Sequence, residues 1–206
     1  MNSYIVLVCG LNIRALNRIT LNDQLALLNS VPDRMLVTAV EDKGSYLVRT
    51  DFGPAEVLGR ILDALRSRCP AIKGAGLVEP STVKSALNEL SVKLEREHDG
   101  RFSASDFGLV FTDGKWRAGL AFPIYPQPLP DFALSGHRTK NAMFFALASG
   151  TALVAKRETK NVHWGSTVND PVERLLKKYT GVAVQLTSRS ANILRRLVEQ
   201  NETRSV

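Results

Sequence analysis

The feature that most restricts the fold of this chain is the run Tyr4 to Cys9, close to its start. The run is apolar throughout, shows no polar alternation and includes the β-branched residues Ile5, Val6 and Val8. A strand of this kind is buried on both faces. We therefore expect it inside a sheet and not at an exposed edge, where its apolar residues would face water.

The elements that follow this strand have clear boundary signals. Thr20 is a helix N-cap, Glu41–Gly44 is a hairpin turn, and Pro54 starts a second helix. That helix has an apolar stripe at helical spacing, formed by Val57, Ile61, Leu62 and Leu65. With strands at Met35–Val40, Ser45–Arg49 and Ala75–Val78, the order is β-α-β-β-α-β. This order predicts a ferredoxin-like unit, a four-stranded antiparallel sheet with both helices on one face.

The remaining chain alternates helices and strands in a similar way. A helix from Pro80 through Leu94 precedes a polar loop or linker, Glu95 to Ser105, and Pro123–Pro130 contains four prolines and is an extended connection. We expect Phe107–Phe111 and Trp116–Phe122 to form a hairpin. Three helices are expected after it, at Lys140–Ala148, Asn169–Tyr179 and Ser190–Glu199. Two further strands are expected at Thr151–Lys156 and Val182–Leu186. The predicted class is α+β with two ferredoxin-like units, at residues 1–80 and 106–206, joined by a helix and linker at 81–105; the second unit carries the Pro-rich insertion.

Composition excludes several classes of protein. A chain of 206 residues with 44% hydrophobic and 23% charged residues is neither disordered nor collagen-like. No apolar run reaches the 18 or more residues of a membrane span, and the first residues have no signal-peptide pattern. Two cysteines, Cys9 and Cys69, are too few for a disulfide framework, so we expect buried thiols and a cytoplasmic location, with no membrane partner.

The net positive charge of the chain comes entirely from the second half of the sequence. Residues 1–100 hold 12 Lys and Arg against 12 Asp and Glu, whereas residues 101–206 hold 15 against 8, a net charge of +7. A one-sided charge of this kind favours an anionic partner, either nucleic acid, a phosphorylated small molecule or a membrane surface. The alternative is that the charge serves solubility alone.

No motif indicates a metal site or a cofactor. The three histidines, His98, His137 and His163, have no ligand spacing, and no Cys-x-x-Cys, P-loop or glycine-rich nucleotide loop occurs. No Gly-x-Ser-x-Gly nucleophile motif is present either. We therefore predict neither metal nor cofactor, and we assign no catalytic residue.

Two polar clusters in the basic half are candidate sites. His137–Asn141 precedes the expected helix at Lys140, so Arg138 and Lys140 are candidates for an anion at a helix N-terminus, or for a solvated first turn. Lys156, Arg157 and Lys160 are followed by Trp164, which suits phosphate contact with base stacking. The alternative for Trp164 is a lid on the core.

The segment Gly10–Ile13, with Asn17–Leu21 at the following helix, resembles the opening of the bacterial domain of unknown function 1697 family. Leu186–Ser190 is similar to that family's closing Thr-x-Arg-Asn segment. The sequence departs from the family at Cys9, where the family has Arg, and at Arg14 and Ala15, where it has glycines. The family's Ser-Gly-Asn turn is here Asp42-Lys43-Gly44.

The resemblance implies two ferredoxin-like units and no particular reaction. It draws attention to Asn12 in the first loop and to Arg189, whose neighbouring hydroxyls either help it to bind an anion or only cap the last helix. We predict that Arg189 points into a concave site shared with the loop around Asn12 and Arg14. The ligand-binding candidates are thus Asn12, Arg14, Arg138, Lys140 and Arg189.

Three functions are compatible with these features. The first is a binding protein whose basic second half recognises nucleic acid or a small anionic ligand. The second is an enzyme acting on a small anionic substrate in a cleft between the halves, with Arg14, Arg138 and Arg189 as anion clamps. The third is an interaction subunit, in which the sheet edge of one copy pairs with a second copy to form a homodimer.

Overall fold

The computed structural model of the chain describes residues 1–11, 18–30, 35–41, 44–72, 74–98, 107–111, 137–138, 142–149, 152–157 and 189–203. The chain divides into two compact units. Of the described residues, the first unit contains those up to Pro80 and the last helix from Arg196 onward. The second unit contains those from Ser81 to Arg195.

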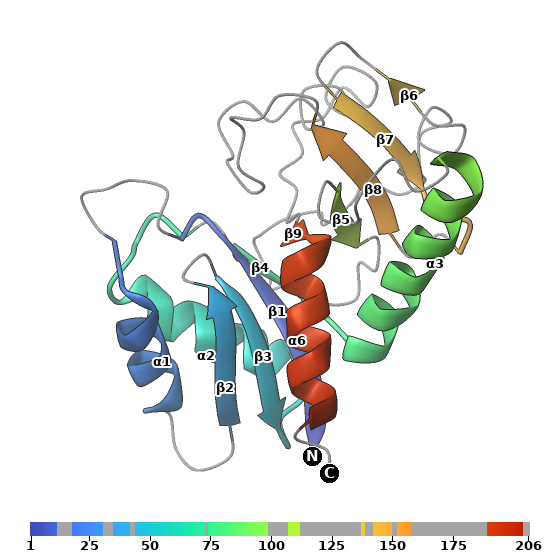
Figure 1. Cartoon of the computed structure of the whole chain (residues 1–206). Helices are drawn as coiled ribbons and strands as arrows, with labels where there is room; N and C mark the ends of the chain where they lie inside the picture. Colours follow the sequence, from blue (N-terminus) through green and yellow to red (C-terminus); the bar gives the residue numbers. More distant parts are fainter. Residues whose placement is uncertain are drawn as a thin grey trace. The chain divides into compact units, whose positions relative to one another are not determined.

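The first unit is built on a four-stranded antiparallel sheet (Figure 1). Its strands are β1 (Asn2–Cys9), β2 (Met35–Glu41), β3 (Ser45–Thr50) and β4 (Gly74–Val78), in the spatial order β2-β3-β1-β4. β1 lies between β3 and β4, and Ile5 and Val6 are fully buried. The expectation that the first apolar run forms an internal strand is confirmed.

Two helices cover one face of this sheet. They are α1 (Leu21–Asn29) and α2 (Pro54–Arg66), and both begin as predicted. The Thr20 side chain accepts a hydrogen bond from the Asp23 amide, while Pro54 occupies the first turn of α2. The core of this layer joins strand residues to helix residues: Tyr4, Val6, Val8, Tyr46 and Val48 pack with Leu28, Val57, Ile61 and Leu65.

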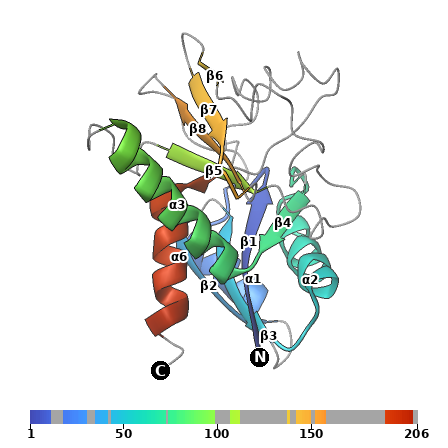
Figure 2. The same cartoon turned by 90° about the vertical axis from the view of Figure 1, so that its right-hand side faces the viewer.

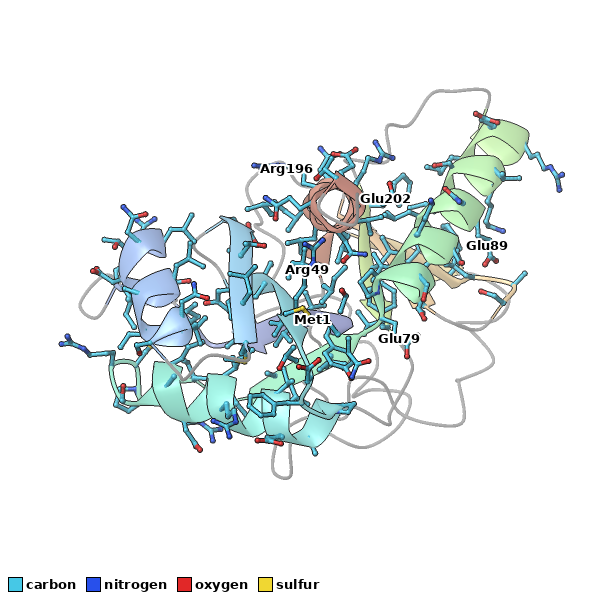
Figure 3. The ribbon with its side chains drawn as sticks, turned by 90° about the horizontal axis from the view of Figure 1, so that it is seen from below. Met1, Arg49, Glu79, Glu89, Arg196 and Glu202 are labelled. Atoms are coloured by element: carbon cyan, nitrogen blue, oxygen red, sulfur yellow. The ribbon has the colours of Figure 1, made fainter. Side chains whose placement is uncertain are left out.

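The last helix is α6 (Ala191–Thr203), and its part in the first unit, from Arg196 onward, lies on the opposite face of the sheet from α2 (Figure 3). Arg49 on β3 donates to the carbonyl oxygens of Asn201 at 2.6 Å and Gln200 at 3.4 Å. A guanidinium among the last carbonyls of a helix satisfies acceptors that have no partner within the helix and offsets the negative end of its dipole. Layers on both faces explain why β1 is apolar without alternation.

The edge strand β2 has a side-chain partner on its outer side. The Asn29 amide nitrogen donates to the Val37 carbonyl at 3.1 Å, and the Val37 amide donates back to Asn29 Oδ1 at 2.8 Å. Asn29 therefore occupies the two backbone groups that another strand would use at this point. Natural sheets protect exposed edges by such means, which opposes a dimer formed through this part of β2.

Substitution of Asn29 by alanine should lower the free energy of unfolding by about 1 kcal/mol, because two hydrogen bonds of an edge strand are lost. It should also increase self-association, because the Val37 backbone becomes available to another edge. Urea denaturation and sedimentation velocity measure these two effects. Asn22→Ala, at an exposed position of the same helix, is the matched control. Equal behaviour of the two variants would contradict a protective role for Asn29.

The second unit contains a five-stranded antiparallel sheet. Its strands are β5 (Phe107–Phe111), β6 (His137–Arg138), β7 (Ala142–Ala146), β8 (Ala152–Arg157) and β9 (Arg189–Ser190), in the order β6-β7-β8-β5-β9. The strands expected near Phe107 and Thr151 are confirmed as β5 and β8. Phe107, Leu109 and Val154 are fully buried.

Helix α3 (Pro80–His98) packs against this sheet (Figure 2). The Lys93 ammonium lies 4.9 Å from the centre of the Phe145 ring. Glu89 accepts hydrogen bonds from Ser149, from its hydroxyl at 2.6 Å and from its amide at 3.2 Å. The predicted apolar stripe is buried and consists of Val83, Leu87, Leu90 and Leu94. The helix continues to His98, so the interpretation of Glu95–His98 as linker is wrong.

The predicted helix at Lys140–Ala148 is also wrong, because Ala142–Ala146 is the strand β7. β7 pairs with β6 on one side and β8 on the other, and the Leu147 amide donates to the Ala152 carbonyl at 2.9 Å across the turn. A short apolar run fits a buried strand as well as a buried helix. Pairing on both sides decides for the strand here, and it removes the helix N-terminus that was expected beside Arg138 and Lys140.

Several expected elements fall outside the described residues. They are the Trp116–Phe122 strand, the Pro-rich connection, the Asn169–Tyr179 helix and the Val182–Leu186 strand. Of the two thiols, Cys69 is buried in the first core, as expected, and the side chain of Cys9 is not described. Among the described residues, no helix has the length and apolar character that a membrane span requires.

Candidate anion-binding groove

An open groove of about 530 Å³ runs along α1 in the first unit. Helix α1 supplies one wall, and the residues just before α1 and just after α2 complete it. The lining residues are Arg18, Ile19, Asp23, Ala26, Leu27, Ser30 and Arg68. The groove therefore combines two cations, one carboxylate, a hydroxyl and an apolar strip.

The wall formed by the helix follows from its periodicity. Asp23, Ala26, Leu27 and Ser30 are spaced three, four and seven residues from the first, so they share one face of α1 and its C-cap. Seven residues of helix extend over about 10 Å. The groove therefore offers room for more than a single small ion along α1.

The two arginines reach the groove from different parts of the chain. Arg18 precedes the N-cap of α1, and Arg68 lies in the turn that follows α2; both are exposed. Within the part of the chain that the structure describes, Arg68 forms no ion pair through its guanidinium. A planar guanidinium binds phosphate or carboxylate through two parallel hydrogen bonds, which makes Arg68 a suitable anion ligand.

Asp23 is held in place by the cap of α1. The Thr20 hydroxyl donates to Asp23 Oδ2 at 2.7 Å, and the Asp23 amide donates to the same hydroxyl oxygen at 3.2 Å. The Thr20 side chain thus caps the amide of the third helical residue, and the Asp23 carboxylate accepts in return from the Thr20 hydroxyl. The carboxylate keeps acceptor capacity after this bond, because an ionised carboxyl group has about four acceptor positions.

A buried polar pair fixes the end of the loop that enters α1. Gln24 is fully buried; its amide nitrogen donates to the Ile19 carbonyl at 2.9 Å, and its Oε1 accepts from the Tyr46 hydroxyl at 2.7 Å. Tyr46 is itself fully buried on β3. The backbone beside Arg18 is thus tied to the core of the sheet.

The start of the same loop is held by a close approach of two backbones. Gly10 and Gly44 both have positive φ, at 94° and 81°. The Val8 amide donates to the Gly44 carbonyl at 2.7 Å, and a Cβ on Gly44 would lie 2.9 Å from the Cβ of Val8. The segment between Leu11 and Arg18, which contains Asn12 and Arg14, therefore joins two fixed ends.

The predicted site residues fall into two groups. Asn12, Arg14, Lys140, Lys160 and Trp164 lie outside the described residues. Arg138, Lys156, Arg157 and Arg189 are located by backbone register alone. Arg138 pairs with Met143, which pairs in turn with Lys156, and Arg189 pairs with Leu109.

This register limits how the cations of the basic second half are arranged. Lys156 and Arg157 are consecutive in β8, so they occupy positions on opposite faces of the sheet. Arg138 and Lys156 occupy one row, two strands apart, at a spacing of about 10 Å between backbones. The Ser190 hydroxyl oxygen accepts from the Ile193 amide at 3.4 Å, which confirms that Ser190 caps the last helix.

The three charged groove residues, Arg18, Asp23 and Arg68, are not among the site residues predicted from the sequence. Asp23 carries a visible signal, since it stands three residues after a capping Thr. Arg68 has no such signal. It reaches the groove because α1 and α2 pack together on one face of the sheet, which a sequence pattern does not specify.

No protein-family model and no curated protein matches the chain. Among solved structures, the fold of this chain is similar to that of a conserved bacterial protein, SP0830 from Streptococcus pneumoniae. The TM-score is 0.59 and the sequence identity 14%, and the alignment covers 98% of this chain and 99% of that chain. At this identity the likeness establishes a shared mixed α/β fold and nothing about activity.

Proposed function

We propose that this protein binds small anionic ligands in the groove along α1. The observation that carries the proposal is the pair Arg18 and Arg68, which line one groove together with the carboxylate of Asp23. A concave site with a few charged groups and an apolar strip is the usual form of a small-molecule site. The segment that contains Asn12 and Arg14 ends at Arg18, which lines the groove.

Charge reversal at Arg68 is expected to weaken binding of inorganic phosphate by about tenfold or more, a change of about 1.4 kcal/mol or more in binding free energy. The physical reason is the loss of a guanidinium ligand and the addition of a repelling carboxylate. Isothermal titration calorimetry on the full chain with phosphate measures the effect for Arg68→Glu.

The matched control is Arg196→Glu, which makes the same change of charge at an exposed position of α6. Equal phosphate affinity for the two variants would place anion binding outside the groove.

A second candidate function is binding of nucleic acid by the basic second half. The observation in its favour is the charge distribution, since residues 101–206 carry the whole surplus of +7. The contacts proposed from the sequence are Lys156, Arg157, Lys160 and Trp164, with Arg138, Lys140 and Arg189 as further cations. Because Lys156 and Arg157 occupy opposite faces of the sheet, only one of these two contacts a nucleic acid bound to a single face. Fluorescence anisotropy with single-stranded RNA should then show affinity that falls steeply with salt.

For this second function, Lys160→Gln should reduce the salt slope by about one, as expected for the loss of one phosphate contact. Lys84→Gln, at an exposed position of α3, is the control. A slope near zero for the unmodified chain would leave solubility as the role of the charge.

We also propose that the chain consists of two ferredoxin-like units. The β-α-β-β-α-β order of the first unit and the antiparallel sheet of the second support this proposal. Membership of the domain of unknown function 1697 family and a cytoplasmic location are likewise proposals. An enzyme that acts on a small anionic substrate remains a proposal, as does a binding site to which both Arg189 and Asn12 contribute.

A further inference from the structure

The groove contains a fixed acceptor as well as its cations. Asp23 receives a hydrogen bond from the Thr20 hydroxyl on Oδ2, and this bond holds the carboxylate beside the N-cap of α1. Within the described part of the chain, Asp23 forms no ion pair. An ionised carboxylate only accepts hydrogen bonds, so it is satisfied by a ligand that brings hydroxyl or amino donors.

A bare inorganic anion can bind the two arginines of the groove but offers no suitable partner to Asp23. Asp23 repels any anion, and such an anion has no donor to offer it when fully ionised. A ligand that places an anionic group on the arginines and hydroxyl groups on Asp23 satisfies both kinds of lining residue. Acidic side chains bind sugar hydroxyls in this manner in dinucleotide-binding folds.

The apolar part of the groove fits the same class of ligand. Ala26 and Leu27 lie between Asp23 and Ser30 on the groove wall, and Ile19 contributes from the loop before α1. A carbon skeleton rather than a second charge suits this strip. The wall of about 10 Å is long enough to separate an anionic group from a set of hydroxyls.

We propose, on the basis of the anion-binding function above, that the groove takes a sugar phosphate. Arg18 and Arg68 hold the phosphate, Asp23 accepts hydrogen bonds from the sugar hydroxyls, and Ala26 and Leu27 contact the carbon skeleton. The sugar phosphate is either free or part of a nucleotide. Asp23 is then the residue that determines specificity for a hydroxylated ligand over plain phosphate.

The test compares inorganic phosphate, ribose 5-phosphate and adenosine monophosphate by calorimetry on the full chain. Ribose 5-phosphate should bind at least about tenfold more tightly than phosphate, which corresponds to one or two added hydrogen bonds. Adenosine monophosphate distinguishes the sources: tighter binding than ribose 5-phosphate supports a nucleotide, and equal or weaker binding supports a free sugar phosphate.

The variant Asp23→Asn probes the residue itself. It should remove most of the preference for ribose 5-phosphate and raise the affinity for phosphate, because the repelling charge is gone. Asp63→Asn, on the exposed side of α2, is the matched control. The comparison of ligands on the unmodified chain tests the proposal even if Asp23→Asn folds poorly.

The outcomes separate the two proposals. If neither phosphate nor ribose 5-phosphate binds, the anion-binding function itself is wrong. If phosphate binds and ribose 5-phosphate binds no more tightly, the groove binds anions and only the sugar phosphate assignment is overturned. The assignment to Asp23 is overturned if the preference is equal in Asp23→Asn and Asp63→Asn.

Discussion

Alanine at position 44 should lower the free energy of unfolding by about 2–4 kcal/mol, the sum of backbone strain and overpacking. Gly44 has a φ of 81°, a conformation that L-residues with a Cβ rarely adopt. The added Cβ would lie 2.9 Å from the Cβ of Val8 and 3.1 Å from its carbonyl oxygen. Both of these atoms belong to the central strand β1, which has neighbours on both sides and cannot move away easily.

Urea denaturation of Gly44→Ala measures this loss, and Gly59→Ala is its control. Gly59 lies inside α2, and a Cβ there would meet no atom within 4 Å. Alanine at this site should leave stability unchanged or raise it by about 0.5–1 kcal/mol, since glycine is a poor helix former. Equal stability of Gly44→Ala and the unmodified chain would show that β1 and the turn before β3 do not meet as described.

Alanine at position 24 should lower the free energy of unfolding by about 2–4 kcal/mol, because it removes two hydrogen bonds from buried polar groups. Gln24 bridges the Ile19 carbonyl and the Tyr46 hydroxyl, and both side chains of the Gln24–Tyr46 pair are fully buried. Tyr46→Phe breaks one of these bonds and should cost about 1–3 kcal/mol. Denaturant unfolding of both variants gives the two values.

The double variant Gln24→Ala/Tyr46→Phe completes a mutant cycle. It should be less destabilised than the sum of the single variants, because each single substitution already breaks the bond between Gln24 and Tyr46. Strict additivity would contradict a direct bond between Gln24 and Tyr46. Since Gln24 also holds the backbone beside Arg18, Gln24→Ala should weaken phosphate binding as well, whereas Tyr46→Phe should weaken it less.

The local signals in the sequence predicted the first unit well. An apolar run without alternation places β1 inside the sheet, Thr20 caps α1, and Pro54 starts α2, because each signal acts within a few residues. Signals of this kind do not decide whether Ala142–Ala146 forms a helix or a strand. Five apolar residues suit a strand or a helix, and the choice depends on the strands β6 and β8 beside them.

The groove was harder to predict, because its parts meet only in the folded unit. Arg18 and Arg68 are fifty residues apart in the sequence and line one groove through the packing of α1 on α2. Gln24 is polar and stands in a helix, so its complete burial depends on a partner, Tyr46, that lies on a strand. The net charge of the second half of the sequence indicated an anionic ligand, whereas the groove lies in the first unit.

The most direct test of anion binding in the groove is a titration of the full, isotope-labelled chain with inorganic phosphate, followed by amide chemical shifts in NMR spectra. If the groove is the site, the largest shifts should fall on the amides of Arg18 to Ser30 and on Arg68, with saturation at a single affinity. Shifts confined to β5–β9 of the second unit, or no saturable shift at all, would contradict an anion site along α1.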